Sequence, residues 1–299
     1  MHDLAGTAAA AFRRALMGIV RRLVVAVERT PGRVAMRWAP GGRGMLVSFS
    51  RGGRSRAVIA RVGGHLFQFD LGDDLQRSVY YRAFERREIR RCLLLLRPGD
   101  TVLDIGANIG AYTVPMAGKV GERGAVHCFE PDPAIVRRLR VNCELNGYLK
   151  QTIINQVAMT DALGQRRFFR SVGSHSGWGS LEQFDDLVIS PIEVEAITLD
   201  EYVKTHAVGH VRLIKMDVEG HEMAVLRGAR RRLTAGLVDF LLIETNEPRL
   251  AIAGSSVRSL IEAVQECGFV MEESWPPLPE TVPTTYCGNV LFRSTGVAS

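Results

Sequence analysis

Short apolar runs alternate with longer amphipathic segments along most of the chain. The short runs have the length of buried strands, and the longer segments place apolar residues at helical spacing. The pattern predicts strands at Thr101–Ile105, Ala125–Phe129, Thr152–Ala158, Val211–Met216, Asp239–Ile243, Phe269–Glu273 and near Asn289–Arg293, with helices at Ala111–Val120, Pro133–Asn146, Glu222–Leu233 and Ser256–Cys267. Because helices separate the strands, we predict a doubly wound, mostly parallel α/β sheet of the Rossmann-like type.

The remaining segments have other patterns. A helical repeat over Ser78–Leu96 predicts one helix, and the loose alternation of Ala57–Leu71 around a Gly-Gly pair predicts a hairpin. We expect residues 1–75 to form an N-terminal extension of an amphipathic helix and short strands, and residues 76–299 to form the α/β domain. Within that domain, residues 166–198 are expected to be an insertion that helps to cover the ligand site.

The composition narrows the class of protein. The chain is 46% hydrophobic and 23% charged, which is typical of a globular protein. Its net charge of +6 comes from scattered arginines, a pattern that favours solvated faces or an anionic substrate over a nucleic-acid surface. The five cysteines lack a C-x-x-C pair, which argues against a zinc site or a disulfide framework. We therefore expect a cytoplasmic protein for which nucleic acid is not the favoured partner.

The apolar stretch at residues 8–29 is interrupted by two Arg-Arg pairs, so no transmembrane helix or signal peptide is expected there. An amphipathic helix that packs on the body is the first expectation. Pairing with another subunit and peripheral contact with a membrane surface are the alternatives. The sequence makes no prediction of the oligomeric state.

A glycine-rich turn follows the first predicted strand. Its glycines let the backbone approach a ligand, and its Gly-x-x-x-Gly spacing differs from the Gly-x-Gly-x-x-Gly of dinucleotide binders. An acid just before the turn would repel a pyrophosphate and accept a cationic ligand. This pattern favours S-adenosylmethionine, and the predicted cofactor-binding residues of the turn are Asp104, Gly106, Ala107, Asn108 and Gly110.

Glu130 ends the second predicted strand, where doubly wound folds place a carboxylate that accepts hydrogen bonds from both ribose hydroxyls. The alternative is an acid at the start of the helix that contains Pro133. Pro131 and Ala158, at the ends of the second and third strands, complete the predicted cofactor site together with Asp217.

A third group of polar residues follows two later strands. Asp217, Glu219 and His221 lie just after Val211–Met216, and Glu244 ends the next strand. The carboxyl ends of parallel strands meet at one edge of the sheet, so we predict that these four residues are catalytic. The alternatives are charges favourable to the following helix for Glu219, a surface position for His221, and a structural ion pair for Glu244.

The sequence resembles the FkbM family of methyltransferases over about residues 78–250. The matching features are Phe84-Glu85, Pro98-Gly99-Asp100, Asp104 to Gly110, Phe129-Glu130-Pro131, Asn142, Asn146, Thr198-Leu199-Asp200, Lys215 to Glu222, Leu226-x-Gly228-Ala229 and Glu244. The resemblance implies a class I methyltransferase fold, S-adenosylmethionine as the donor, and typically O-methylation of sugars, polyketides or related metabolites. It implies neither a particular acceptor nor a role for residues 1–75.

We therefore predict an S-adenosylmethionine-dependent O-methyltransferase for a hydroxyl on a small or carbohydrate-type acceptor. Asp217, Glu219 or His221 would orient and deprotonate that hydroxyl, with the assistance of Glu244. The three acids could instead hold a divalent cation, although no metal site is predicted. The alternative functions are an RNA methyltransferase, a non-catalytic cofactor-binding domain and, less favoured by the glycine spacing, a nicotinamide oxidoreductase.

Overall fold

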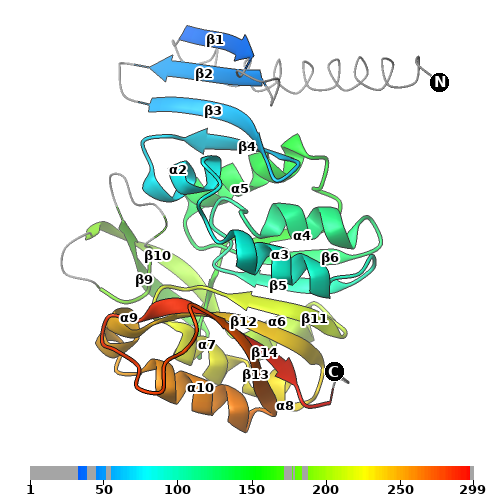
Figure 1. The fold of residues 1–299 in the computed structure, drawn as a ribbon, viewed down its shortest axis with the longest axis vertical. Helices are drawn as coiled ribbons and strands as arrows, with labels where there is room; N and C mark the ends of the chain where they lie inside the picture. Colours follow the sequence, from blue (N-terminus) through cyan, green and yellow to red (C-terminus); the bar gives the residue numbers. More distant parts are fainter. Residues whose placement is uncertain are drawn as a thin grey trace.

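The computed structural model describes residues 33–38, 45–51, 55–171, 177, 179–183 and 188–296. The predicted N-terminal helix within residues 8–29 lies outside these residues. The centre of the molecule is a seven-stranded sheet (Figure 1). Across the sheet, its strands are β13 (Phe269–Trp275), β14 (Cys287–Ser294), β12 (Val238–Asn246), β11 (Val211–Met216), β5 (Thr101–Ile105), β6 (Ala125–Phe129) and β7 (Thr152–Asn155).

The sheet is parallel except for one strand. β5 lies between β11 and β6, and each of these pairs is parallel, as are β11 with β12 and β6 with β7. β14 runs antiparallel to both of its neighbours, β12 and β13. The predicted doubly wound, mostly parallel sheet is confirmed, and the carboxyl ends of β5, β6, β11 and β12 therefore meet at one edge.

Helices cover both faces of the central sheet (Figure 1). Alternate residues of the central strands face opposite helix layers. Val102 and Leu213 pack with α3 (Arg86–Leu95) and α4 (Thr113–Val120), on the face that α5 (Pro133–Leu145) also covers. Leu103 and Ile214 point the other way. That second layer consists of α6 (Leu199–Thr205), α7 (Glu222–Gly228), α8 (Arg230–Thr234), α9 (Glu247–Ile252) and α10 (Val257–Glu266).

A second, antiparallel sheet precedes the central one. Its strands lie in chain order as β1 (Arg33–Trp38), β2 (Met45–Arg51), β3 (Ser55–Val62) and β4 (His65–Asp70), which confirms the predicted hairpin within Ala57–Leu71. Two asparagines attach β4 to the α/β domain. Asn146 Oδ1 accepts a hydrogen bond from the backbone of Leu66, and Asn142 Oδ1 accepts one from Gln68. These amide side chains pair backbone groups at the edge of the sheet.

The prediction of one helix over Ser78–Leu96 is wrong. The structure has α2 (Asp74–Tyr80) and α3, separated by five residues that include two left-handed ones. Arg82 has a φ of 59° and Glu85 has a φ of 33°. A left-handed residue cannot continue a right-handed helix, so the chain turns here and brings Glu85 to the edge of the central sheet.

Two other predicted elements are interrupted. Thr152–Ala158 is not one strand, because β7 ends at Asn155 and the chain then leaves the sheet to form β8 (Ala158–Met159), which pairs with β10 (Val188–Ile197). The helix predicted over Glu222–Leu233 is divided at Ala229 into α7 and α8. At Gly228, the last residue of α7, a Cβ atom would lie 2.1 Å from the backbone oxygen of Thr160.

The segment predicted as an insertion contains β9 (Gly164–Ser171), which runs antiparallel to β10. Together with β8 these strands form a three-stranded sheet beside the carboxyl ends of the central strands (Figure 1). Among the described residues, none of the helices is both long enough and apolar enough to cross a bilayer.

Candidate active site

One cavity opens where the central strands end. Of the residues predicted to bind the cofactor or to catalyse, ten line it: Gly106, Ala107, Asn108, Glu130, Pro131, Ala158, Asp217, Glu219, His221 and Glu244. Asp104 and Gly110 do not line it. The edge of the sheet thus brings together the three groups of residues that the sequence analysis placed there.

The glycine turn is wedged between two neighbouring strands. The backbone N–H groups of Gly106 and Ala107 both donate to the carbonyl oxygen of Phe129, at 3.0 Å. Gly106 has a φ of 79°, and a Cβ atom there would lie 1.7 Å from the backbone oxygen of Asp217. Only glycine satisfies both the left-handed φ and the close approach.

Glu130 lies at the end of β6 and is 6% exposed. Its Oε2 accepts a hydrogen bond from the backbone N–H of Asn108 at 3.1 Å, and its Oε1 accepts one from Asp132 at 2.9 Å. Burial outweighs these hydrogen bonds and raises the pKa of Glu130 from 4.5 to about 7. A carboxylate oxygen can accept two hydrogen bonds, so each oxygen retains capacity for a ribose hydroxyl.

Asp104 is buried beneath the glycine turn, outside the cavity. Its Oδ2 accepts a hydrogen bond from Thr113 Oγ1 at 2.5 Å, and its Oδ1 lies 4.0 Å from Lys215 Nζ. Burial raises the pKa of Asp104. The residue therefore supports the turn from below, and its predicted contact with the cofactor stays a prediction.

Lys215 connects the glycine turn to Asp217. Its buried ammonium group donates to Asp217 Oδ2 at 2.9 Å and to the carbonyl oxygen of Gly106 at 3.3 Å. Burial alone would lower the pKa of Lys215, but the carboxylates of Asp217, Asp104 and Glu85 raise it above its ordinary value. Lys215 therefore stays charged and holds Asp217 in place.

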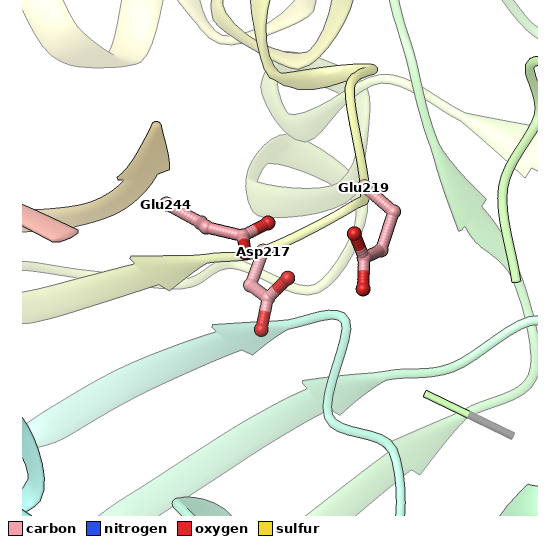
Figure 2. A group of neighbouring side chains, drawn as sticks. All are labelled: Asp217, Glu219 and Glu244. Carbon is pink, nitrogen blue, oxygen red and sulfur yellow. The ribbon is translucent and has the colours of Figure 1, made fainter. Parts of the chain in front are cut away.

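Three carboxylates converge from the ends of β11 and β12 (Figure 2). Asp217, Glu219 and Glu244 each place an oxygen within 4.8 Å of the others. Glu219 has a φ of 56° and forms an ion pair with Arg249 at 3.1 Å. Like charges confined at this spacing oppose full ionisation, so the group of three can hold and exchange protons.

Glu244 differs from the other two acids in its contacts. Its Oε1 accepts a weak hydrogen bond from Cys287 Sγ at 3.9 Å, and its buried Oε2 has no partner in the described part of the chain. Burial, followed by the negative charge of Glu219, raises the pKa of Glu244 well above its usual range. Burial and the charge of Asp217 do the same for the pKa of Glu219.

His221 lines the cavity with both ring nitrogens engaged. Its Nδ1 lies 3.0 Å from Glu182 Oε1, and its Nε2 lies 2.9 Å from Thr160 Oγ1. A ring held at both nitrogens is well fixed. These contacts fasten the segment between β9 and β10 to the turn before α7, and the predicted catalytic role of His221 stays a prediction.

Two acids that line the cavity, Glu85 and Asp132, were not predicted as site residues. Glu85 lines the cavity and accepts hydrogen bonds from Tyr112 Oη at 2.6 Å and from Asn289 Nδ2 at 3.1 Å. Burial, followed by the charge of Asp217, raises the pKa of Glu85. The only signal in the sequence was its membership of the Phe84-Glu85 pair in the family resemblance.

Glu222 was quoted in the sequence motif without a role. It is 1% exposed, and its Oε1 accepts hydrogen bonds from the backbone N–H groups of Val218 and Gly220 at 3.1 and 3.2 Å. Burial raises the pKa of Glu222 to about 7 despite these hydrogen bonds. Glu222 thus shapes the turn that presents Glu219 and His221.

The strand order, the single antiparallel strand, the glycine turn and the acid at the end of the second strand define a class I S-adenosylmethionine-dependent methyltransferase. The model of the methyltransferase FkbM domain matches residues 104–271. The chain belongs to this family, as its resemblance indicated.

Three curated relatives cover most of the domain. A 2-O-methyltransferase, NoeI, from Sinorhizobium fredii is 28% identical over 68% of this chain and 82% of its own length. The 31-O-demethyl-FK506 methyltransferase FkbM from Streptomyces tacrolimicus is 28% identical over 58% of this chain and 72% of its own length. The hexuronic acid methyltransferase AglP from Haloferax volcanii is 26% identical over 66% of this chain and 78% of its own length.

Proposed function

We propose that this methyltransferase transfers a methyl group to a hydroxyl of a small-molecule or carbohydrate-type acceptor. The observation that carries the proposal is the group of three carboxylates, Asp217, Glu219 and Glu244, which lines the same cavity as the glycine turn and Glu130. A hydroxyl is a weak nucleophile at neutral pH, so its methylation benefits from a proton acceptor at this position. Two of the relatives are O-methyltransferases by name, and the third is a hexuronic acid methyltransferase.

The residues of the cavity fit the methyl donor. Glu130 has acceptor capacity for ribose hydroxyls, and Asn108, Pro131 and Ala158 line the space beside it. Gly106 lets the turn lie directly against the backbone of Asp217, and both ends of the cavity lining, Glu130 and the carboxylates, belong to one cavity. Bound S-adenosylmethionine supplies an electrophilic methyl group on a sulfonium, which the acidic edge also attracts by charge.

We assign to Glu244 the removal of the proton from the acceptor hydroxyl. Its Oε2 is the buried carboxylate oxygen of the three acids that has no partner within the described chain, whereas Asp217 is held by Lys215 and Glu219 by Arg249. The raised pKa of Glu244 makes it a stronger base than an ordinary carboxylate once it is ionised. Asp217 and Glu219 then orient the hydroxyl and share the proton.

The alternative role of the same acids is to bind a divalent cation, because Mg²⁺ and Ca²⁺ prefer carboxylate oxygens. Lys215 and Arg249 already neutralise two of the three carboxylates, which weakens the attraction for a cation. We therefore propose that transfer needs no divalent cation. Activity that is lost in EDTA and restored by Mg²⁺ would favour the metal-assisted route instead.

The test is transfer of a labelled methyl group from S-adenosylmethionine to a panel of acceptors by the purified full-length chain. The panel comprises sugars, glycosides, hydroxylated macrocycles and, as the alternative, structured RNA. We expect label in at least one hydroxylated small molecule and none in RNA. Labelling of RNA alone, with an activity that falls steeply as salt is added, would contradict the proposal.

A further inference from the structure

A cation lines the same cavity as the acids. Successive residues of β9 face opposite sides of its strand, as expected for extended chain. Phe168 and Arg170 both line the cavity. Arg167 and Phe169 lie on the other side, where the Arg167 guanidinium stands 5.5 Å from the centre of the Phe169 ring. Of the three arginines of β9, Arg170 lines the cavity and Arg167 lies on the other side of the strand.

Hydrogen bonds attach this strand to the acidic turn. The backbone N–H and C=O groups of Phe169 pair with those of Ser180, at 2.8 and 3.1 Å. Ser180 Oγ in turn donates to the backbone oxygen of Glu219 at 2.9 Å. Arg170, the neighbour of Phe169, is therefore held beside the turn that carries the carboxylates.

The guanidinium of Arg170 forms no ion pair with the described residues. Its Nε is buried and has no hydrogen-bond partner there. Lys215, the lysine that lines the same cavity, is paired with Asp217 at 2.9 Å. A guanidinium with a buried, unused donor is costly in the free protein and is well suited to a ligand that completes it.

We propose that Arg170 binds an anionic group of the acceptor, a carboxylate or a phosphate, so that the substrate is an acidic hydroxylated molecule. The guanidinium can bind such a group through two parallel hydrogen bonds. The carboxylates of Asp217, Glu219 and Glu244 repel the anionic end and accept the hydroxyl end. With both signs of charge in one cavity, the acceptor would bind with its anionic group on Arg170 and its hydroxyl toward Glu244. The proposal rests on the proposed function and narrows its substrate class.

The experiment compares acceptors that differ in one group. Methyl glucuronide, methyl glucoside and methyl glucoside 6-phosphate are titrated into the full-length chain saturated with S-adenosylhomocysteine, and each is also assayed for methyl transfer. The variants are Arg170→Gln and Arg170→Lys, with Arg167→Gln as the control because it lies on the other side of the same strand.

We expect the wild-type chain to bind one or both acidic sugars more tightly than methyl glucoside. Arg170→Gln should weaken binding of the acidic sugar, or raise its KM, by about ten-fold or more, because a hydrogen bond to a charged group is lost. Arg170→Lys should restore part of the affinity and Arg167→Gln should change nothing. The preferred sugar separates carboxylate from phosphate recognition.

Two results would overturn the inference. One is that the wild-type chain binds the acidic and the neutral sugars with equal affinity, or binds none of them. The other is a loss of S-adenosylhomocysteine affinity in Arg170→Gln, which would place the guanidinium on the carboxylate of the cofactor. Tight binding of an acidic sugar without methyl transfer would contradict the proposed function and leave the inference intact.

Discussion

The backbone oxygen of Asp217 occupies the space that a side chain on Gly106 would need, at 1.7 Å from the position of its Cβ atom. The glycine turn after β5 and the acidic turn after β11 are therefore in direct contact. A change in one must displace the other.

Replacement of Gly106 by alanine tests this contact. We expect Gly106→Ala to lower the free energy of unfolding by about 2–4 kcal/mol, since it combines a strained φ with an overlap, and to abolish S-adenosylhomocysteine binding. Thermal unfolding and calorimetry measure the two effects. The matched control is Gly99→Ala, because Gly99 has a φ of 95° and open space around its Cβ position. Equal effects at both positions would remove the overlap as a cause.

The raised pKa of Glu130 predicts that cofactor binding depends on pH. The pKa of Glu130 is raised to about 7, so much of the carboxyl is protonated at pH 6 and ionised at pH 8. The ionised form accepts hydrogen bonds from ribose hydroxyls, so binding should tighten as the pH rises through 7 and should release a proton. In Glu130→Gln we expect about ten-fold weaker binding or more, with this pH dependence removed. Calorimetry at several pH values, in buffers of different ionisation enthalpy, measures both.

The same raised pKa has a consequence for stability. A carboxyl with a folded-state pKa of about 7 and an unfolded value of 4.5 stabilises the fold fully below pH 4.5, and this contribution is lost as the pH rises through 7. In the absence of a ligand, the wild-type chain should therefore lose stability as the pH rises from 5 to about 8, and Glu130→Gln should not show this loss. The free energy of unfolding of the variant should rise relative to that of the wild-type chain over this range. Urea unfolding across this range measures the difference, and a constant difference would contradict the assignment.

Substitution of Glu244 tests the base. We expect Glu244→Gln to lower kcat by about 10²- to 10⁴-fold and to leave S-adenosylhomocysteine affinity within about two-fold. In the wild-type chain kcat should rise with pH, because the proton acceptor must be ionised. Glu262→Gln, on the exposed side of α10, is the control. Full activity of Glu244→Gln would shift the role to Asp217 or Glu219.

His221 should behave as a fastening residue. We expect His221→Ala to raise the KM for the acceptor by several-fold, because it removes a link between Glu182 and the catalytic turn, and to change kcat much less than Glu244→Gln does. Steady-state kinetics separates the two parameters. A kcat loss as large as that of Glu244→Gln would restore His221 as the base.

The alternation of strands and helices, the mostly parallel sheet and the assembly of most of the site could be predicted from the sequence. Thr101–Ile105 and Val211–Met216 are continuous apolar runs that end in polar turns, and parallel strands bring such turns to one edge. This rule placed Asp217 and Glu244 in one cavity with Glu130. It could not say that Asp104 lies beneath the turn, because that depends on the partners Thr113 and Lys215.

Other parts of the site depend on backbone conformation that leaves no periodic signal. The apolar repeat continues through Arg82 and Glu85, but both residues are left-handed, and the resulting break is what delivers Glu85 to the cavity. The inward direction of Arg170 depends on the register of β9 with β10 and on the contact of Ser180 with Glu219. Such tertiary contacts override local propensity.

The most direct test of the account is to identify the atom that receives the methyl group. The full-length chain is supplied with S-adenosylmethionine labelled with ¹³C at the methyl carbon, and the product from the acceptor panel is examined by NMR. We predict a ¹³C-methyl group bonded to a former hydroxyl oxygen of a small-molecule or carbohydrate acceptor. A labelled methyl group on nitrogen or carbon, or none on any acceptor while S-adenosylmethionine binds, would contradict it.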